Sequence, residues 1–409
     1  MKGLLQEPVA NNKIQCNVCA HRCKLGEGQT GICRVRKNVG GEIQYLAYNS
    51  PQSVCPLVGN CAAGTFCASP PSCNWSCSFC TSAAITMPEV DEAVTEAYDN
   101  DIPLPLTPEG YLDKRAIMGK RAIPLPMAML EAQPPDEVEL LKRSVGIEPS
   151  QIASPAELVE AWKRSGEAGF GMRGSEPIIH LEAVIETFSA IREAGGFVLI
   201  NTNGYWTPES LELLAPHIDQ VEIGFKGSGN PEFMRKVASV PRMEPVYETI
   251  KGLAQYPIDI LISDVPVLHE TWEDDFRALS KFISETLPPR DFPRLKLYPW
   301  KNRIPQEAFG KFVAGRATGG TDSKLGRLGY YAHLEDAARI ALEHLDSVWF
   351  SMVWSKTPDG MSLLNSMADL AVAEEGAALV RVAKTPEALG HVLVTNERLF
   401  SHAAMPPGW

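Results

Sequence analysis

All ten cysteines of this 409-residue chain lie within its first 80 residues. They stand at positions 16, 19, 23, 33, 55, 61, 67, 73, 77 and 80. A secreted protein built on disulfides would spread its cysteines through the fold, so this distribution argues against that class. The first residues, MKGLLQEPVANNK, turn polar too early for a secretory signal. No apolar run approaches the ~20 residues of a membrane span. We therefore expect a reduced, cytoplasmic protein that makes no membrane contact and holds metal near its N-terminus.

Chain length and net charge further restrict the class of protein and of partner. A chain of 409 residues is too long for one ordinary core and suggests two or three domains. The formal net charge of −12 disfavours a nucleic-acid partner, because phosphates attract cations. We expect an N-terminal cysteine-rich loop over 1–50, a central domain over 51–309 and a C-terminal domain over 310–409. A Pro-rich stretch at about 98–150 interrupts the central domain and is typical of a functional loop or lid, with a disordered segment as the alternative.

The central part of the chain alternates between strand and helix patterns. Strands are expected at 170–173, 197–203, 221–226, 258–268 and 294–300, and helices at 154–166, 181–194, from 207, at 246–255 and at 272–286. This alternation predicts parallel strands joined by right-handed crossovers. With one strand before Cys73, about six βα units result, which suits an α/β partial barrel. The last 100 residues predict a smaller α+β unit with helices at 333–345 and 385–393 and strands at 347–353 and 379–384.

The last three cysteines form the pattern Cys73-x3-Cys77-x2-Cys80. Three thiolates in eight residues can bind three irons of a four-iron–four-sulfur (4Fe–4S) cluster. The fourth iron is then free for chemistry, whereas a purely electron-carrying cluster usually has four cysteines. A zinc knot or three reduced thiols without metal are the alternatives.

This motif, with Phe79 before its last cysteine, resembles the signature of the radical S-adenosylmethionine (SAM) superfamily. The resemblance implies a partial (β/α)6 barrel in which SAM chelates the open iron and is cleaved to a 5′-deoxyadenosyl radical. Gly174-Ser175-Glu176-Pro177 resembles the GGEP segment that contacts the SAM amino group, with Ser at the second glycine. Further cofactor-binding candidates at strand ends are Asn201, Asn203, Lys226 and Asp264.

The first four cysteines form a second constellation, Cys16-x2-Cys19-x3-Cys23-x9-Cys33. Four thiolates at short spacing can close a tetrahedral site around one iron or zinc ion. A closed shell indicates a structural or electrostatic role more than chemistry. Cys55, Cys61 and Cys67 follow at intervals of six and are best interpreted as small buried apolar residues.

The whole chain resembles the methanogenesis marker protein 10 family in its N-terminal cysteine loop, cluster motif, Pro-rich insert and C-terminal domain. The resemblance implies a cobalamin-dependent methyltransferase. Its product would be 5-C-methylarginine, formed at the δ-carbon of one arginine in the α subunit of methyl-coenzyme M reductase. It also implies an electron donor as a partner and a cobalamin-binding role for 310–409. An unactivated C–H bond is not acidic, so a radical route is required.

Several weaker candidates accompany this interpretation. The chain contains no DxHxxG motif, so a bound corrin would lack a histidine below cobalt, and Leu325 or Leu328 could cover that face. Tyr111, in the Pro-rich insert, could occupy the open iron until SAM displaces it. Glu222 is a candidate for binding the substrate guanidinium. The competing functions are a glycyl-radical activating enzyme without cobalamin and a non-catalytic iron–sulfur electron carrier.

Overall fold

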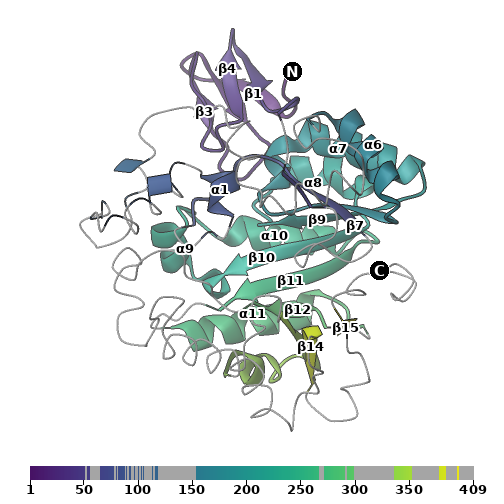
Figure 1. Cartoon of the computed structure of the whole chain (residues 1–409). Helices are drawn as coiled ribbons and strands as arrows, with labels where there is room; N and C mark the ends of the chain where they lie inside the picture. The colour runs from purple at the N-terminus through teal and green to yellow at the C-terminus, as the bar shows by residue number, and fades with distance from the viewer. Residues whose placement is uncertain are drawn as a thin grey trace.

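The molecule is described here from a computed structural model of the whole chain (Figure 1). The described residues are 1–50, 53–55, 65–77, 153–266, 271–290, 293–298, 336–351, 377–383 and 394–395, with single residues and short pieces between 80 and 117.

Residues 1–50 form two small antiparallel sheets at the top of Figure 1. The first sheet contains β1 (Gln6–Val9), β2 (Lys13–Cys16) and β3 (Lys24–Leu25), and the second contains β4 (Arg36–Val39) and β5 (Glu42–Tyr45). The buried guanidinium of Arg36 pairs with Glu182, which lies in the helical layer of the central domain. This segment is therefore anchored to the rest of the protein by a buried ion pair as well as by apolar packing.

One mixed sheet organises the rest of the described chain, with its strands in sequence order from β6 to β15. Its members are β6 (Ser53–Cys55), β7 (Thr65–Ser69), β8 (Gly169–Met172), β9 (Phe197–Thr202), β10 (Gln220–Lys226), β11 (Asp259–Val265), β12 (Leu295–Leu297), β13 (Ser347–Ser351), β14 (Ala377–Ala383) and β15 (Val394–Thr395). Neighbours from β7 to β13 pair in parallel, whereas β6 and the last two strands pair antiparallel. The α/β fold with a parallel sheet that we expected is confirmed.

The expected boundary at residue 309 does not coincide with an edge of the sheet. β13 pairs with β12 in parallel, and β14 pairs with β13. The strands that we assigned to a separate C-terminal unit therefore extend the central sheet. The periodicity of a strand does not reveal which sheet it joins, and that is why the sequence placed them apart. Residues 310–335 lie outside the described residues.

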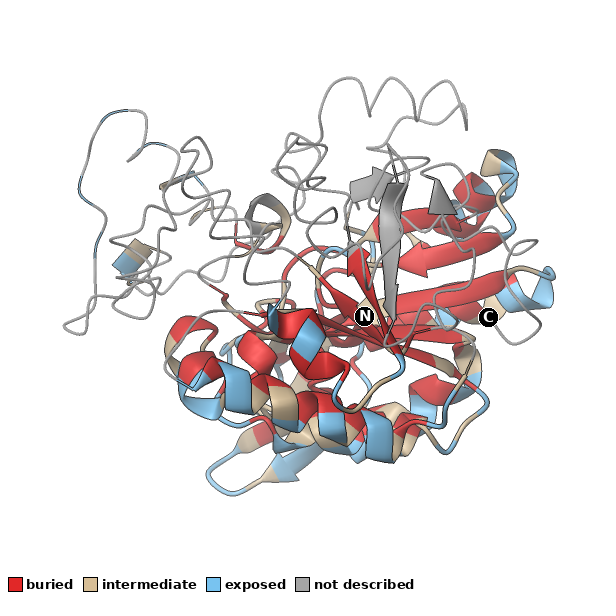
Figure 2. Ribbon diagram, turned by 90° about the horizontal axis from the view of Figure 1, so that it is seen from below, coloured by how far each residue is buried: buried red, intermediate tan, exposed pale blue. Residues whose placement is uncertain are grey.

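Helices follow the strands and cover one face of the sheet. They are α6 (Pro155–Ser165), α7 (Leu181–Glu193), α8 (Pro208–Leu214), α9 (Pro231–Val237), α10 (Glu244–Leu253) and α11 (Trp272–Thr286), with a short α1 (Ala83–Thr86) and 3₁₀ turns at Pro177–His180, Ala215–His217 and Gly227–Gly229. Along β10, Val221, Ile223 and Phe225 belong to the main hydrophobic core, whereas Glu222 and Gly224 alternate with them. We call the first side the helix face and the other the inner face. Figure 2 shows the described parallel strands of the central sheet almost entirely buried, with exposed residues on the outer sides of the helices.

Local signals placed the helices well. The predicted capping box is present, because Ser154 Oγ accepts from the Glu157 backbone while the Glu157 carboxylate accepts from the Ser154 N–H. Gly166 closes that helix in the left-handed conformation, φ 71°. The helix expected at 272–286 has those bounds. The short helix α9 and the N-terminal hairpins were not predicted.

The described residues contain no helix long and apolar enough to cross a membrane. Most of the Pro-rich insert and the helix expected at 385–393 lie outside them.

Candidate functional site

The cluster loop, residues 70–80, leaves the carboxyl end of β7 and carries Cys73, Cys77 and Cys80. The backbone N–H of Trp75 donates to Cys73 Sγ over 3.3 Å, and Asn203 Nδ2 donates to the same sulfur over 3.9 Å. Burial raises the pKa of the Cys73 thiol well above its ordinary value, and the nearby charges of Glu176 and Cys77 raise it further. A metal cation at this sulfur would therefore favour the thiolate form of Cys73.

Two buried N–H groups beside Cys73 support a sulfur-rich ligand. Asn74 Nδ2 and Trp75 Nε1 have no hydrogen-bond acceptor among the described residues. Unsatisfied buried donors are costly, and the sulfurs of an iron–sulfur cluster are acceptors that proteins commonly hydrogen-bond. The residues of the loop therefore fit a 4Fe–4S cluster in donor type and in polarity.

Glu176 ties the segment after β8 to the segment after β9. Its carboxylate accepts from Thr202 Oγ1 and from the Asn203 backbone N–H, both over 2.6 Å. Burial raises its pKa to about 7, against the effect of these hydrogen bonds. Both carboxylate oxygens therefore accept hydrogen bonds from the chain itself. The cofactor-binding role of Glu176 stays a prediction.

The Gly174-Ser175 pair explains why serine is tolerated in the GGEP-like segment. Gly174 has φ +84°, and a Cβ there would lie 2.6 Å from Ser69 Oγ. Ser175 is not among the described residues with positive φ. Only the first of the two positions therefore requires glycine. Pro177 begins the 3₁₀ turn that follows, with Glu176 as its N-cap.

Asn201 and Asn203 end β9 on the same side of the molecule as the cluster loop. Asn201 is opposite Glu222 in the parallel register and so lies on the inner face. Asn203 Nδ2 donates to Asn74 Oδ1 over 2.7 Å, which joins the β9 end to the cluster loop. The structure thus brings together Cys73, the GGEP-like segment and Asn203. Their cofactor-binding roles stay predictions.

Lys226 and Asp264 end adjacent strands but differ in orientation. The Lys226 ammonium lies over Gly224 on the inner face, where a Cβ at Gly224 would be 3.2 Å from it. Asp264 lies two residues after the core residue Ile262 and therefore on the same side of the sheet, the helix face. Its carboxylate accepts from the Ser228 N–H over 3.3 Å and from Ser228 Oγ over 3.1 Å. These hydrogen bonds stabilise the left-handed turn after Lys226, and the cofactor-binding role of Asp264 stays a prediction.

Sequence reasoning missed a charged cluster on the inner face. Lys296 Nζ lies 2.8 Å from Glu222 Oε2, and the Tyr298 hydroxyl donates to Glu222 Oε1 over 3.2 Å. Although burial alone would raise the pKa of Glu222, the Lys296 ammonium and Arg173 lower it to about 2. The available signal was a lysine between two leucines in a short buried strand. Glu222 is buried and already paired, so it does not present a free carboxylate to a substrate guanidinium.

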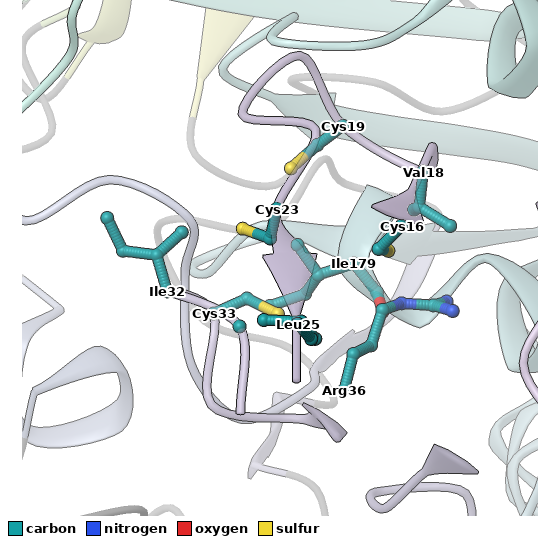
Figure 3. Close-up of a pocket in the computed structure, with 10 residues that line it drawn as sticks. Cys16, Val18, Cys19, Cys23, Leu25, Ile32, Cys33, Arg36 and Ile179 are labelled. Carbon is teal, nitrogen blue, oxygen red and sulfur yellow. The ribbon is translucent and has the colours of Figure 1, made fainter. Parts of the chain in front are cut away.

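The four N-terminal cysteines line one pocket together with Arg36 and Ile179 (Figure 3). Burial raises the pKa of Cys19 well above its ordinary value, and the charges of Cys33, Cys16 and Cys23 raise it further. The backbone of His21 lowers the pKa of Cys19, and that of Val35 lowers the pKa of Cys33, against the larger effect of burial. The donor set therefore fits a metal ion that prefers thiolates. Among the described residues, however, no three Cys, His, Asp or Glu side chains are already gathered as ligands of a metal ion.

Other predicted residues fall outside this geometry. Cys67 is buried on the inner face of β7, and its sulfur lies 3.5 Å from Thr65 Oγ1. Five candidates lie outside the described residues, namely Phe79, Tyr111, Leu325, Leu328 and Cys61, and the side chain of Cys55 is also not described.

Comparisons with known proteins place this site in a family. The profile of the Radical SAM superfamily matches residues 69–283, more than half of the chain. The uncharacterized protein MJ0808 of Methanocaldococcus jannaschii is 24% identical over 303 residues, which cover 70% of this chain and 71% of that protein.

Among solved structures, a domain of pyruvate-formate lyase-activating enzyme from Bacteroides vulgatus has 14% identity and a TM-score of 0.32, with 43% of this chain and 94% of that one covered. SuiB of Streptococcus suis bound to S-adenosylmethionine has 13% identity and a TM-score of 0.30, with 44% and 37% covered. TYW1 with a lysine-pyruvate adduct has 10% identity and a TM-score of 0.31, with 78% and 79% covered. On the profile match, which includes Cys73, Cys77 and Cys80, the chain belongs to the radical SAM superfamily, and membership implies a 4Fe–4S cluster and SAM.

Proposed function

We propose that the protein is a cobalamin-dependent radical SAM methyltransferase that places a methyl group on the δ-carbon of an arginine. The proposed substrate is the α subunit of methyl-coenzyme M reductase. The observation that carries the proposal is the presence of two cysteine sites packed against each other. The Ser72 hydroxyl, next to Cys73, donates to the Cys33 carbonyl over 2.8 Å. This arrangement supports the whole-chain resemblance to the methanogenesis marker protein 10 family, in which both motifs occur together.

In this proposal, the chain's own residues bind the cluster and orient the loop around it. When bound, the cluster with SAM supplies hydrogen-atom abstraction from an unactivated carbon, and cobalamin supplies a transferable methyl group. Cys73, Cys77 and Cys80 would hold the cluster, and Glu176 keeps Asn203 against the cluster loop. No general base is required, because the arginine δ-carbon is not acidic. An external electron donor must supply the reducing equivalents.

Recognition of the arginine is a matter of long-range charge in this proposal. The net charge of −12 favours the approach of a cationic peptide. Glu222 is not assigned to the guanidinium, because Lys296 and Tyr298 occupy its two oxygens. Leu325 and Leu328 lie outside the described residues, so no residue is assigned to the corrin.

We also propose one iron or zinc ion at Cys16, Cys19, Cys23 and Cys33. Three buried thiols and the half-buried Cys23 line one pocket, and the pKa of Cys19 is raised by burial and further by its three neighbours, so a divalent cation would relieve the repulsion between thiolates there. The surrounding residues are largely apolar, which indicates a structural site without an exchangeable ligand position.

The decisive experiment is mass spectrometry of an arginine-containing peptide from the reductase α subunit. The reconstituted protein is incubated anaerobically with SAM, methylcobalamin and a reductant. We expect a mass gain of one methyl group, located on the arginine side chain by fragmentation. SAM with an isotopically labelled methyl group should label the product after repeated turnover.

A matched reaction with the Cys77→Ala variant is the control, and it should yield neither methylated peptide nor 5′-deoxyadenosine. Formation of 5′-deoxyadenosine without corrin binding or methylation by the unaltered protein would contradict the proposal. That result would favour a glycyl-radical activating enzyme.

A further inference from the structure

His21, which lies between Cys19 and Cys23, reaches from the N-terminal segment into the cluster loop. Its Nε2 is 2.8 Å from the backbone carbonyl of Asn74, the residue after Cys73. A carbonyl oxygen only accepts, so Nε2 carries the proton and donates. In the opposite direction, the Ser72 hydroxyl donates to the Cys33 carbonyl over 2.8 Å. Two residues that flank Cys73 are therefore bonded directly to the segment that carries the four N-terminal cysteines.

The same segment is bonded to the turn that follows β9. The Ala20 N–H donates to the Tyr205 carbonyl over 3.0 Å, and Cys19 forms an isolated β-bridge with Trp206. The Tyr205 ring packs edge-on against His21, with ring centroids 4.9 Å apart. It also contacts Trp75 of the cluster loop, with centroids 6.0 Å apart. His21 is thus enclosed by both loops that surround Cys73.

A third connection runs through buried side chains. Arg36, which lines the four-cysteine pocket, lies over the ring of Tyr45 at 5.3 Å. The Tyr45 hydroxyl and His180 Nδ1 are 2.7 Å apart, and His180 Nε2 donates to the Pro71 carbonyl over 2.7 Å. Because Nε2 carries the proton, the tyrosine hydroxyl is the donor to Nδ1. Pro71 opens the cluster loop, so this chain links the pocket to the loop's first turn.

We propose that His21 and Ser72 are positioning residues through which the four-cysteine segment sets the geometry of the cluster loop. The inference rests on the proposed metal at the four cysteines. A metal there fixes Cys19, Cys23 and Cys33 relative to one another. Because His21 lies between two of these residues and Ser72 bonds to the third, the metal also fixes the cluster loop around Cys73. Both residues act through the backbone and touch neither SAM nor iron.

The test compares the His21→Ala and Ser72→Ala variants with the unaltered full-length protein after anaerobic reconstitution. Acid-labile sulfide reports the 4Fe–4S cluster alone, because the four-cysteine site contains no sulfide. Electron paramagnetic resonance of the reduced cluster, titrated with SAM, reports SAM affinity at the cluster. One lost hydrogen bond should weaken SAM binding about fivefold. We also expect an altered resonance signal and an unchanged non-cluster metal content.

Two further variants keep the test specific. His21→Gln can still donate to the Asn74 carbonyl and should recover much of the SAM affinity. Glu209→Ala removes a different contact of the four-cysteine segment, the ion pair in which Arg22 Nη2 lies 2.7 Å from the Glu209 carboxylate on α8. That variant should leave sulfide content and SAM affinity unchanged. Wild-type resonance and SAM affinity in both His21→Ala and Ser72→Ala would overturn the inference.

A Cys19→Ser variant separates this inference from the proposed metal. If Cys19→Ser loses the non-cluster metal, the effect of His21→Ala should be much smaller in that background, because the histidine is then no longer held. Fully additive effects would overturn the coupling. If Cys19→Ser retains its metal, the proposed metal site fails, while the single-variant comparison still decides whether His21 and Ser72 position the loop.

Discussion

The Lys296 ammonium lies 2.8 Å from the carboxylate of Glu222, and both side chains are buried on the inner face of the sheet. They come from strands 74 residues apart in sequence. The register places Lys296 beside Ser263 and Ser263 beside Gly224, which lies two residues from Glu222 on β10, so Lys296 reaches Glu222 diagonally across β11. This buried ion pair distinguishes the inner face of the sheet from the apolar helix face.

Removal of the Glu222 charge should destabilise the fold strongly. In Glu222→Gln, Lys296 remains as a buried cation without its carboxylate, at an expected cost of about 3–5 kcal/mol in unfolding free energy. Urea denaturation of the metal-free protein measures this loss. A Glu222→Gln, Lys296→Met double variant should recover most of the stability. As the control, Glu160→Gln breaks an exposed pair with Lys163 and should cost about 0.5 kcal/mol or less.

The same pair predicts an acid dependence of stability. Lys296 and Arg173 lower the pKa of Glu222 from the ordinary 4.5 to about 2 in the folded protein. The ionised carboxylate therefore stabilises the fold above about pH 4.5, and this stabilisation is lost as the pH falls towards 2. The difference in unfolding free energy between the unaltered protein and Glu222→Gln should narrow over that interval. A difference independent of pH would contradict the assignment.

The sequence predicted those parts of the fold that depend on neighbouring residues. Ser154, Pro155 and Glu157 specify a helix start through local hydrogen bonds and a fixed φ, so α6 follows from the sequence. The alternation of strand and helix predicts parallel pairing because each crossover is long enough to contain a helix. The spacing of the cysteines predicts both metal sites for the same reason, because ligands that are near one another in sequence can bind one metal ion or one cluster.

Non-local contacts escaped prediction. Nothing near Lys296 in sequence specifies Glu222, because the pairing depends on the register of three strands. The contacts of His21 and Ser72 involve backbone carbonyls, which every residue carries, so no side-chain pattern marks them. The face on which Asp264 lies could not be predicted for a similar reason, because one step along a strand changes the face on which a side chain lies.

Gly174 and Ser175, the first two residues of the GGEP-like segment, should respond differently to substitution. In Gly174→Ala, a Cβ would lie 2.6 Å from Ser69 Oγ, and φ +84° is strained for any side chain. We expect SAM affinity to fall about tenfold or more. Ser175→Gly restores the family's second glycine and should change the affinity by about twofold or less, because Ser175 has no positive φ. Isothermal titration of the reconstituted protein measures both, and equal effects would contradict the geometry.

Substitution of two buried cysteines, Cys77 and Cys67, distinguishes a cluster ligand from a residue that only packs. Cys77→Ala removes a proposed iron ligand and should abolish 5′-deoxyadenosine formation. Cys67→Ala removes another buried thiol, on strand β7 just before the cluster loop, where the Cys67 sulfur lies beside Gly171 of β8. This variant should retain the cluster and the activity. Loss of the small thiol is expected to cost about 1 kcal/mol of stability. The measurements are acid-labile sulfide per chain and chromatographic quantification of 5′-deoxyadenosine after reduction with SAM present. Full retention of 5′-deoxyadenosine formation in Cys77→Ala would refute the cluster assignment, and loss of cluster in Cys67→Ala would show that a fourth cysteine participates.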